Sequence, residues 1–274
     1  MHAATTTTEP GLVTARMAMS KVPEVTVYFW IIKILATTVG ETAADYLNMD
    51  LGFGLRGTTA VTVALLGATF VAQFRVRRYI PALYWWTVLL VSVTGTLITD
   101  NLTDALGVPL PVSTACFAAA LVVVFLAWRL TEGTLSIHSV RTRRREAFYW
   151  LAVLVTFALG TAAGDLIAEK LALGYWLSLV LFAAVIALIT ALHLGLRAGA
   201  VAAFWAAYII TRPLGASLGD LLTQPGDAGG FGLDGTVVNL VFLGVIVLLV
   251  GYLSWSRVDQ IDEAAAPEAA SVTR

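Results

Sequence analysis

The sequence has few charged residues and few of the residues that hold metals or disulfides. Only 13% of its 274 residues are Asp, Glu, Lys or Arg, about half the share in a typical soluble protein. The single cysteine excludes an intramolecular disulfide framework and a multi-thiolate metal site. Three scattered histidines do not suit a zinc or haem site. With a formal net charge of −1, the chain also has no field to attract a nucleic acid.

Hydrophobic residues make up 58% of the chain, and its mean hydropathy is +0.83. A helix needs about 20 mostly apolar residues to cross a bilayer. Eight stretches meet this requirement, near 25–46, 57–74, 80–103, 110–128, 147–168, 172–192, 198–222 and 236–255. We therefore expect an all-α integral membrane protein with eight transmembrane helices over residues 23–256. The polar segments 1–22 and 257–274 are predicted to be disordered cytoplasmic tails.

Lys and Arg are distributed unevenly between the two alternating sets of connecting segments. Thirteen of the seventeen lie in the set that includes both termini, and only Arg56 and Lys170 lie in the other. Cytoplasmic segments carry the excess of these residues, so we expect both termini in the cytoplasm. The remaining two cationic residues, Lys33 and Arg212, lie inside predicted spans.

An internal repeat arranges the eight spans as four pairs. In three odd-numbered spans a Trp is followed fifteen residues later by an Asp, at 85 and 100, 150 and 165, and 205 and 220. The strings around these acids are GTLITDNLTDAL, GTAAGDLIAEKL and GASLGDLLTQPG, and the first span has ATTVGETAADYL, with Glu41 in the place of Asp. We predict four two-helix pseudo-repeats, near 25–79, 80–145, 146–197 and 198–256, about an axis along the membrane normal.

The repeat places polar side chains on one helix face, because residues four apart lie above one another. In three repeats a Thr precedes the acid by four positions and a second carboxylate follows it by four. The candidate ion-binding residues are Glu41, Asp45, Asp100, Asp104, Asp165, Glu169, Asp220, Thr37, Thr96 and Thr161. They could be solvated helix ends. However, helix C-termini disfavour anions unless a cation compensates, and ionisable groups within spans mark ion routes.

Two compensating cations are present in the sequence. Lys33 precedes Glu41 by eight residues, and Arg212 precedes Asp220 by the same interval. A cation at this depth is costly against lipid, so we expect both to point into the bundle. They could form salt bridges that lock the helices together, or act as a gate or a surrogate charge between transport steps. The sequence leaves both interpretations open.

The strings KVPEVTVYFWIIKILATTVGETAADYL and RPLGASLGD resemble a family of bacterial multi-span proteins labelled only "uncharacterised membrane-anchored protein". The likeness extends over about residues 21–256. It implies a location in the bacterial inner membrane, and it implies no activity.

The leading functional hypothesis is a transporter or channel for a small inorganic cation, a divalent metal or a proton, with no resident cofactor. Glu41, Asp100, Asp165 and Asp220 would converge on the pseudo-symmetry axis. Carboxylate and hydroxyl oxygens are the ligands that Mg²⁺, Mn²⁺ and Ca²⁺ prefer. One alternative is a membrane scaffold or sensor that transports nothing. Another is a membrane-embedded enzyme acting on a lipid, although the chain has no nucleophile or phosphate-binding motif.

Overall fold

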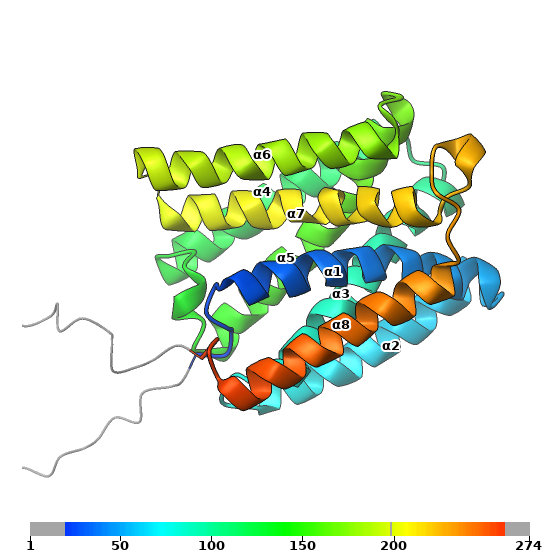
Figure 1. Cartoon of the computed structure of the whole chain (residues 1–274). Coiled ribbons are helices and arrows are strands. Elements are labelled where there is room, and N and C mark those ends of the chain that lie inside the picture. Colours follow the sequence, from blue (N-terminus) through cyan, green and yellow to red (C-terminus); the bar gives the residue numbers. More distant parts are fainter. Residues whose placement is uncertain (1–19, 198, 261–274) are drawn as a thin grey trace, which may run out of the picture.

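The structure is a computed structural model that describes residues 20–197 and 199–260 (Figure 1). Eight long helices dominate this part of the chain. They are α1 (Val27–Asp45), α2 (Gly54–Arg75), α3 (Pro81–Asp100), α4 (Leu110–Glu132), α5 (Arg143–Asp165), α6 (Gly174–Leu196), α7 (Ala200–Thr223) and α8 (Gly235–Ser256). Each is long and apolar enough to cross a membrane. The prediction of eight spans is confirmed at this level, and it indicates a multi-pass membrane protein.

The helices form two layers around a common axis. The inner bundle consists of α1, α3, α5 and α7, which run in the same direction (Figure 1). Within it, α1 packs against α3 and α7, and α5 packs against the same two helices. More than half of the most apolar window of each inner helix is buried, compared with at most 22% for α2, α4, α6 and α8. These four outer helices therefore present most of their surface to the surroundings.

Each outer helix packs on the inner helix of the next repeat rather than on its own. The closest helix neighbours are α2 with α3, α4 with α5, and α6 with α7, and α8 returns to pack on α1. The four pairs thus interlock in a closed circle. Because α8 covers α1, the first and last repeats are in contact although they are far apart in the sequence.

The repeats also share an irregular end. Short π-helical segments extend the first three inner helices, at Tyr46–Asp50, Asn101–Ala105 and Leu166–Lys170. In the first, the Leu51 N–H donates to the Tyr46 carbonyl over 3.0 Å, in the i→i+5 pattern of this helix type. The fourth repeat differs, because α7 ends at Thr223 and Pro225 follows. Each of the three π segments begins directly after a carboxylate of the repeated motif, Asp45, Asp100 or Asp165.

Glycines close the four interfaces of the inner bundle. A Cβ added to any one of them would come within 2.5 Å of the neighbouring helix. Gly40 faces Ser92, Gly95 faces Phe157, Gly160 faces Arg212 and Gly215 faces Thr37. Small residues allow helix backbones to approach closely in membranes. Three of these glycines lie five residues before the repeated acid, so one sequence motif supplies both the close contact and the carboxylate.

Aromatic side chains close the bundle at the N-terminal ends of its helices. Phe29 contacts Trp85 and Tyr208 with ring centroids 5.4 and 6.3 Å apart, and Tyr149 contacts Tyr84 and Trp205 at 6.4 and 6.2 Å. These four contacts connect α1 to α3, α3 to α5, α5 to α7 and α7 back to α1. We call these six side chains the aromatic layer. The Tyr84 and Tyr149 hydroxyls are also hydrogen-bonded to each other.

Residues 20–26, which we call the entry segment, cross the same end of the bundle. The backbone N–H of Lys21 donates to Val140 over 3.1 Å, and that of Glu24 donates to Asp259 over 2.8 Å. The Lys21 ammonium forms a buried ion pair with Glu146. The entry segment thus joins the α4–α5 connection to the residues that follow α8.

The boundaries of the expected tails therefore differ from the structure. Ser20, Lys21, Val22 and Asp259 were expected in the disordered tails 1–22 and 257–274, but all four are buried. The Tyr79 hydroxyl donates to the Asp259 carboxylate over 2.5 Å. Burial raises the pKa of the Asp259 carboxyl, and this hydrogen bond opposes the rise. Residues 1–19 and 261–274 lie outside the described part of the chain.

The glycine interfaces predict a specific loss of stability. Gly160→Ala should lower the free energy of unfolding by about 1–3 kcal/mol, the usual cost of overpacking, because its Cβ would meet the Arg212 side chain. Gly67→Ala is the matched control, since nothing lies within 4 Å of the Cβ it adds to α2. Unfolding in detergent micelles measures both variants. Equal stability of the two would contradict a close-packed inner bundle.

Candidate functional site

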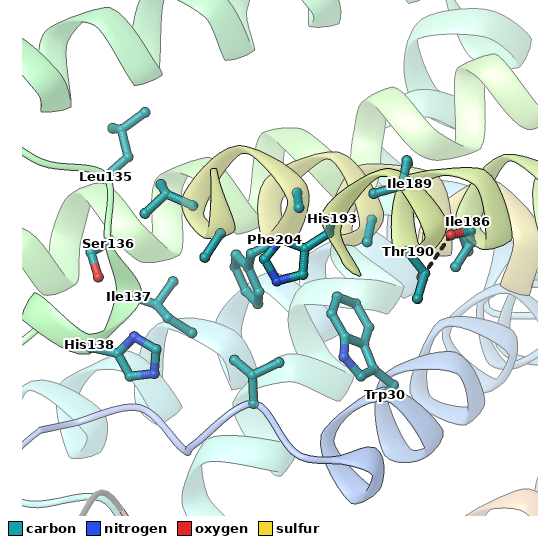
Figure 2. A pocket seen from close by; sticks show the side chains of 15 residues that line it. Trp30, Leu135, Ser136, Ile137, His138, Ile186, Ile189, Thr190, His193 and Phe204 are labelled. Carbon is teal, nitrogen blue, oxygen red and sulfur yellow. Dashed lines mark hydrogen bonds between the residues drawn. The ribbon is translucent and has the colours of Figure 1, made fainter. Parts of the chain in front are cut away.

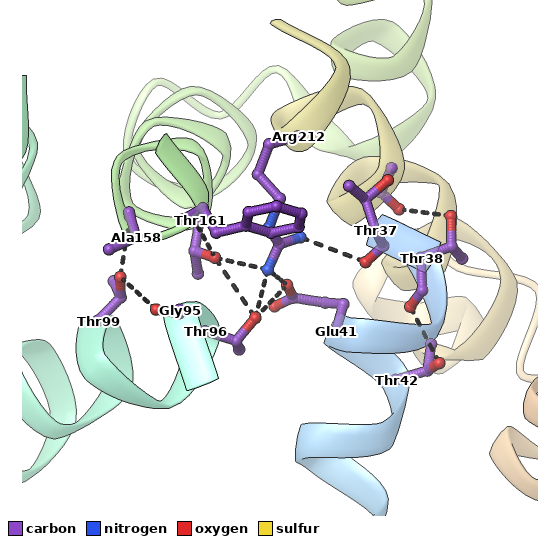
Figure 3. Close-up of polar contacts among 12 residues, drawn as sticks. Thr37, Thr38, Glu41, Thr42, Gly95, Thr96, Thr99, Ala158, Thr161 and Arg212 are labelled. Carbon is purple, nitrogen blue, oxygen red and sulfur yellow. Dashed lines mark hydrogen bonds and ion pairs between the residues drawn. The ribbon is translucent and has the colours of Figure 1, made fainter. Parts of the chain in front are cut away.

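The candidate site lies around Arg212, on the axis of the inner bundle. This residue is the thirteenth of the 24 residues of α7, and its side chain is fully buried. At about 1.5 Å of rise per residue it lies about 18 Å from the start of the helix, near mid-span. Its Nη2 atom lies 2.7 Å from Glu41 Oε2 of α1, forming a buried ion pair (Figure 3).

Two threonine hydroxyls complete this ion pair. The same Arg212 Nη2 donates to Thr161 Oγ1 over 2.8 Å and also to Thr96 Oγ1. The Thr96 hydroxyl donates in turn to Glu41 Oε2 over 3.1 Å. Figure 3 shows the guanidinium between the two hydroxyls and the carboxylate. We call these four residues the polar centre; each inner helix and each repeat contributes one of them.

Backbone geometry supports the polar centre from the α1 side. The Arg212 Nη1 atom donates to the Thr37 carbonyl over 3.4 Å. The Thr37 hydroxyl donates a hydrogen bond to the Ile34 carbonyl over 2.6 Å, and the Thr38 hydroxyl donates one to the Gly215 carbonyl over 3.0 Å. The predicted site residue Thr37 therefore contributes its backbone rather than its hydroxyl. These bonds fix α1 against α7 beside the ion pair.

A second cation is buried next to the polar centre. Lys33 is completely buried, and its Nζ lies 4.3 Å from the Phe157 ring centroid and 4.2 Å from that of Tyr208. This Nζ has no hydrogen-bond partner within residues 20–197 and 199–260. The Arg212 guanidinium lies 5.4 Å from the same Phe157 ring. Lys33 thus lies between two aromatic faces, which favour a cation, about 12 Å along α1 from Glu41.

The remaining candidate carboxylates with described side chains are less buried than Glu41, which is 7% exposed. Asp45, Asp100, Asp165 and Asp220 are half-buried, and Asp104 is exposed, where its carboxylate accepts a hydrogen bond from Thr103 over 2.9 Å. Asp45 and Asp100 remain close enough to Glu41 to interact with it electrostatically. The side chain of Glu169 lies outside the described set. Glu41 is thus the buried end of a series of acids that leads away from the aromatic layer.

The expected metal site is not formed by the described residues. Among residues 20–197 and 199–260, no three carboxylate, imidazole or thiol side chains are grouped so that they could hold a metal ion. The sequence predicted that Glu41, Asp100, Asp165 and Asp220 converge on such an ion. Instead, an arginine takes the place next to Glu41 that a metal would need.

Two features of the site were not predicted from the sequence. Phe157 lies at the repeat position that holds Lys33 and Arg212 in the first and fourth repeats, and its ring contacts both cations. This shared position was a usable signal. The sequence allowed salt bridges between helices for both cations, but it did not identify Glu41 as the partner of Arg212. The expectation that both cations point into the bundle is confirmed by their complete burial.

The buried pair predicts strong energetic coupling. Removing one partner of a buried ion pair costs about 3–5 kcal/mol, because the other charge is left unpaired. We expect this loss for Glu41→Met, and we expect the double variant Glu41→Met, Arg212→Met to lose less than the sum of the two single variants. Unfolding in detergent measures this cycle.

A matched control for the cycle is the ion pair between Arg145 and Glu132, which lies at the surface end of α4. This pair is partly exposed, with 27% of the Arg145 and 13% of the Glu132 side chain accessible, so substitutions there should cost less than those at the buried pair. Additive losses at Glu41 and Arg212 would show that the two side chains are not coupled.

Comparisons with known proteins agree with the four-fold architecture. A family model described as "Repeat of Unknown Function (DUF347)" matches the chain four times, over residues 28–79, 83–134, 148–198 and 203–259. Each match contains one inner helix and the outer helix that follows it. Neither the curated proteins nor the solved structures gave a match. The repeat deduced from the sequence is confirmed, and the chain belongs to the DUF347 repeat family.

Proposed function

We propose that this protein is a membrane transporter for a small cation. One observation carries the proposal: a buried Arg212–Glu41 pair lies at mid-span among the four inner helices. The pair and two threonine hydroxyls together supply one residue from each repeat. Ionisable residues inside membrane spans are costly and mark substrate and ion pathways by default. Repeated units about an axis along the membrane normal are also an arrangement that transporters use.

In the proposed mechanism Glu41 accepts the transported cation, and Arg212 is the internal counter-ion that takes its place. The guanidinium neutralises Glu41 in the conformation described here. A cation that enters from the side of the half-buried acids displaces the guanidinium from the carboxylate. The Thr96 and Thr161 hydroxyls remain as neutral oxygen ligands. When the cation leaves, Arg212 returns, so the buried carboxylate is never without a positive partner.

The ligand set favours a proton or a monovalent cation. Ca²⁺ takes six to eight oxygen ligands, and Mg²⁺ requires near-octahedral coordination. The polar centre offers one carboxylate and two hydroxyls. A divalent metal would need additional carboxylates to converge on Glu41, and the described residues do not provide that grouping. A divalent cation is therefore the weaker form of the proposal.

The two ends of the bundle suggest how the centre is reached. The aromatic layer and the entry segment cover the end where the described chain begins and finishes. The half-buried Asp45, Asp100 and Asp220 lie toward the other end. The distribution of Lys and Arg supports a cytoplasmic location for the covered end. On this basis we propose a bacterial inner-membrane protein, closed toward the cytoplasm in this conformation.

A scaffold without transport activity is the second candidate. The observation in its favour is that glycine contacts and the buried pair both hold the inner bundle closed. A scaffold requires Glu41 only for stability, whereas a transporter requires its charge for flux. The two proposals therefore differ in what happens when the carboxylate is replaced by its neutral isostere in a folded protein.

Flux in proteoliposomes tests the proposal. We expect the reconstituted protein to move protons, K⁺ or Na⁺ faster than protein-free vesicles, and Glu41→Gln to lower the rate by about tenfold or more, because the acceptor charge is lost. Ion-sensitive dyes inside the vesicles report each ion, and Mg²⁺ and Mn²⁺ are included to test the divalent form.

Glu132→Gln is the control, since it removes a carboxylate from a peripheral ion pair. It should retain the wild-type rate. If Glu41→Gln folds and matches the wild type, or if no ion moves faster than in empty vesicles, transport through Glu41 is wrong.

A further inference from the structure

A separate pocket opens at the covered end of the bundle. It lies among the start of α1, the C-terminal half of α6, the first turns of α7 and the α4–α5 connection (Figure 2). Its volume is about 410 Å³, within the range of about 300–1,000 Å³ typical of sites for small molecules. None of the polar centre residues lines it. The pocket is therefore a second feature that the transport proposal does not use.

The walls of the pocket are mainly apolar and aromatic. The Trp30 and Phe204 rings meet there with centroids 5.9 Å apart. Ile186 and Ile189 of α6 form another wall (Figure 2). The Thr190 hydroxyl faces its own helix, where it donates to the Ile186 carbonyl over 2.9 Å. The deep part of the pocket thus suits a hydrocarbon chain.

Polar groups gather toward one end of the pocket. His193 lies one turn beyond Ile189 on α6, and its imidazole lines the pocket (Figure 2). Arg197 follows His193 by four residues as the exposed C-cap of α6, next to the pocket in sequence but outside its lining. Along this end of α6 the side chains change from aliphatic to imidazole to guanidinium. An amphiphile with a hydrocarbon chain and an anionic head has the matching order of groups.

The position of the pocket identifies the source of this amphiphile. α6 is the most exposed of the eight spans, with only 6% of its apolar window buried, so its surface faces lipid. Eleven of the fifteen Lys and Arg residues in the described part of the chain lie in the segments at this end of the bundle. Clusters of Lys and Arg beside membrane spans attract anionic lipids.

We propose that this pocket binds one anionic phospholipid. One acyl chain lies between α1, α6 and α7 against Trp30 and Phe204, and the phosphate lies at His193 and Arg197. The lipid would also touch Val25 of the entry segment, which lines the pocket. Because Trp30 and Phe204 both contact Phe29 of the aromatic layer, the bound lipid stabilises the closed end of the bundle.

Native mass spectrometry of the full chain tests the site. Detergent-purified protein is incubated with phosphatidylglycerol or with phosphatidylcholine of the same acyl chains. We expect one phosphatidylglycerol to be retained in preference to phosphatidylcholine. Arg197→Gln should lower this preference by about fivefold, the contribution of one basic residue near an anionic headgroup.

Arg257→Gln is the matched control, because Arg257 caps α8 in the same left-handed conformation as Arg197 caps α6. It should leave the preference unchanged. An equal loss with both variants would overturn the proposed headgroup site, and so would equal retention of the two lipids by the wild type.

A second pair of variants tests the chain-binding part. Ala203 lines the pocket, whereas the neighbouring Ala202 of α7 is exposed and does not line it. Ala203→Phe should abolish lipid retention, and Ala202→Phe should preserve it. Thermal unfolding with added lipid provides an independent readout. We expect phosphatidylglycerol to raise the unfolding midpoint of the wild type and to leave that of Ala203→Phe unchanged.

Inorganic phosphate, added alone, distinguishes a lipid from a free anion. It should not raise the unfolding midpoint. A rise equal to that given by phosphatidylglycerol, or equal lipid retention by Ala203→Phe and Ala202→Phe, would overturn the proposal. These outcomes are independent of ion flux, so the lipid site and the transport function can fail separately.

Discussion

The buried ion pair between Arg212 and Glu41 is the interaction on which the arrangement of the inner bundle depends. Neither charge is tolerable alone at mid-span, and each is supplied by a different terminal repeat. The ion pair therefore requires α7 to pack against α1. The threonines at equivalent positions of the two middle repeats accept further hydrogen bonds from Arg212 Nη2. The contact that neutralises the two charges is thus also a contact that closes the bundle.

The repeats supply a symmetrical frame, and single substitutions at one repeat position make its centre asymmetric. Eight residues before each acid, the four inner helices carry Lys33, Ser92, Phe157 and Arg212. The glycine contacts, by contrast, recur at all four interfaces. The backbone is therefore nearly four-fold, whereas the charge is not. Four identical side chains at this level would leave four like charges, or none, around one axis.

Much of this architecture could be predicted from the sequence, because it depends on local patterns. Apolar length identifies the spans, and the fixed Trp-to-Asp interval identifies the repeat. Which residues meet across the axis depends on the order of helices around the circle and on their relative shifts, which local patterns do not contain. Arg212 and Asp220 are about 12 Å apart along one helix, whereas Glu41 lies directly across a helix interface. For the same reason, local patterns alone do not establish whether Glu41, Asp100, Asp165 and Asp220 meet, and no metal-binding group of three such side chains forms among the described residues.

The burial of the Glu41 carboxylate limits how the centre can change. If Arg212 moved away from Glu41, the carboxylate would remain buried beside two hydroxyl groups, which cannot neutralise it. Lys33 is the nearest other buried cation described, but it lies about 12 Å along α1 from Glu41, held between two aromatic rings. A proton or an incoming cation must therefore arrive as the guanidinium leaves. The free-energy cost of an unpaired buried carboxylate would thus couple the departure of the guanidinium to the arrival of the cation, without any further gating element.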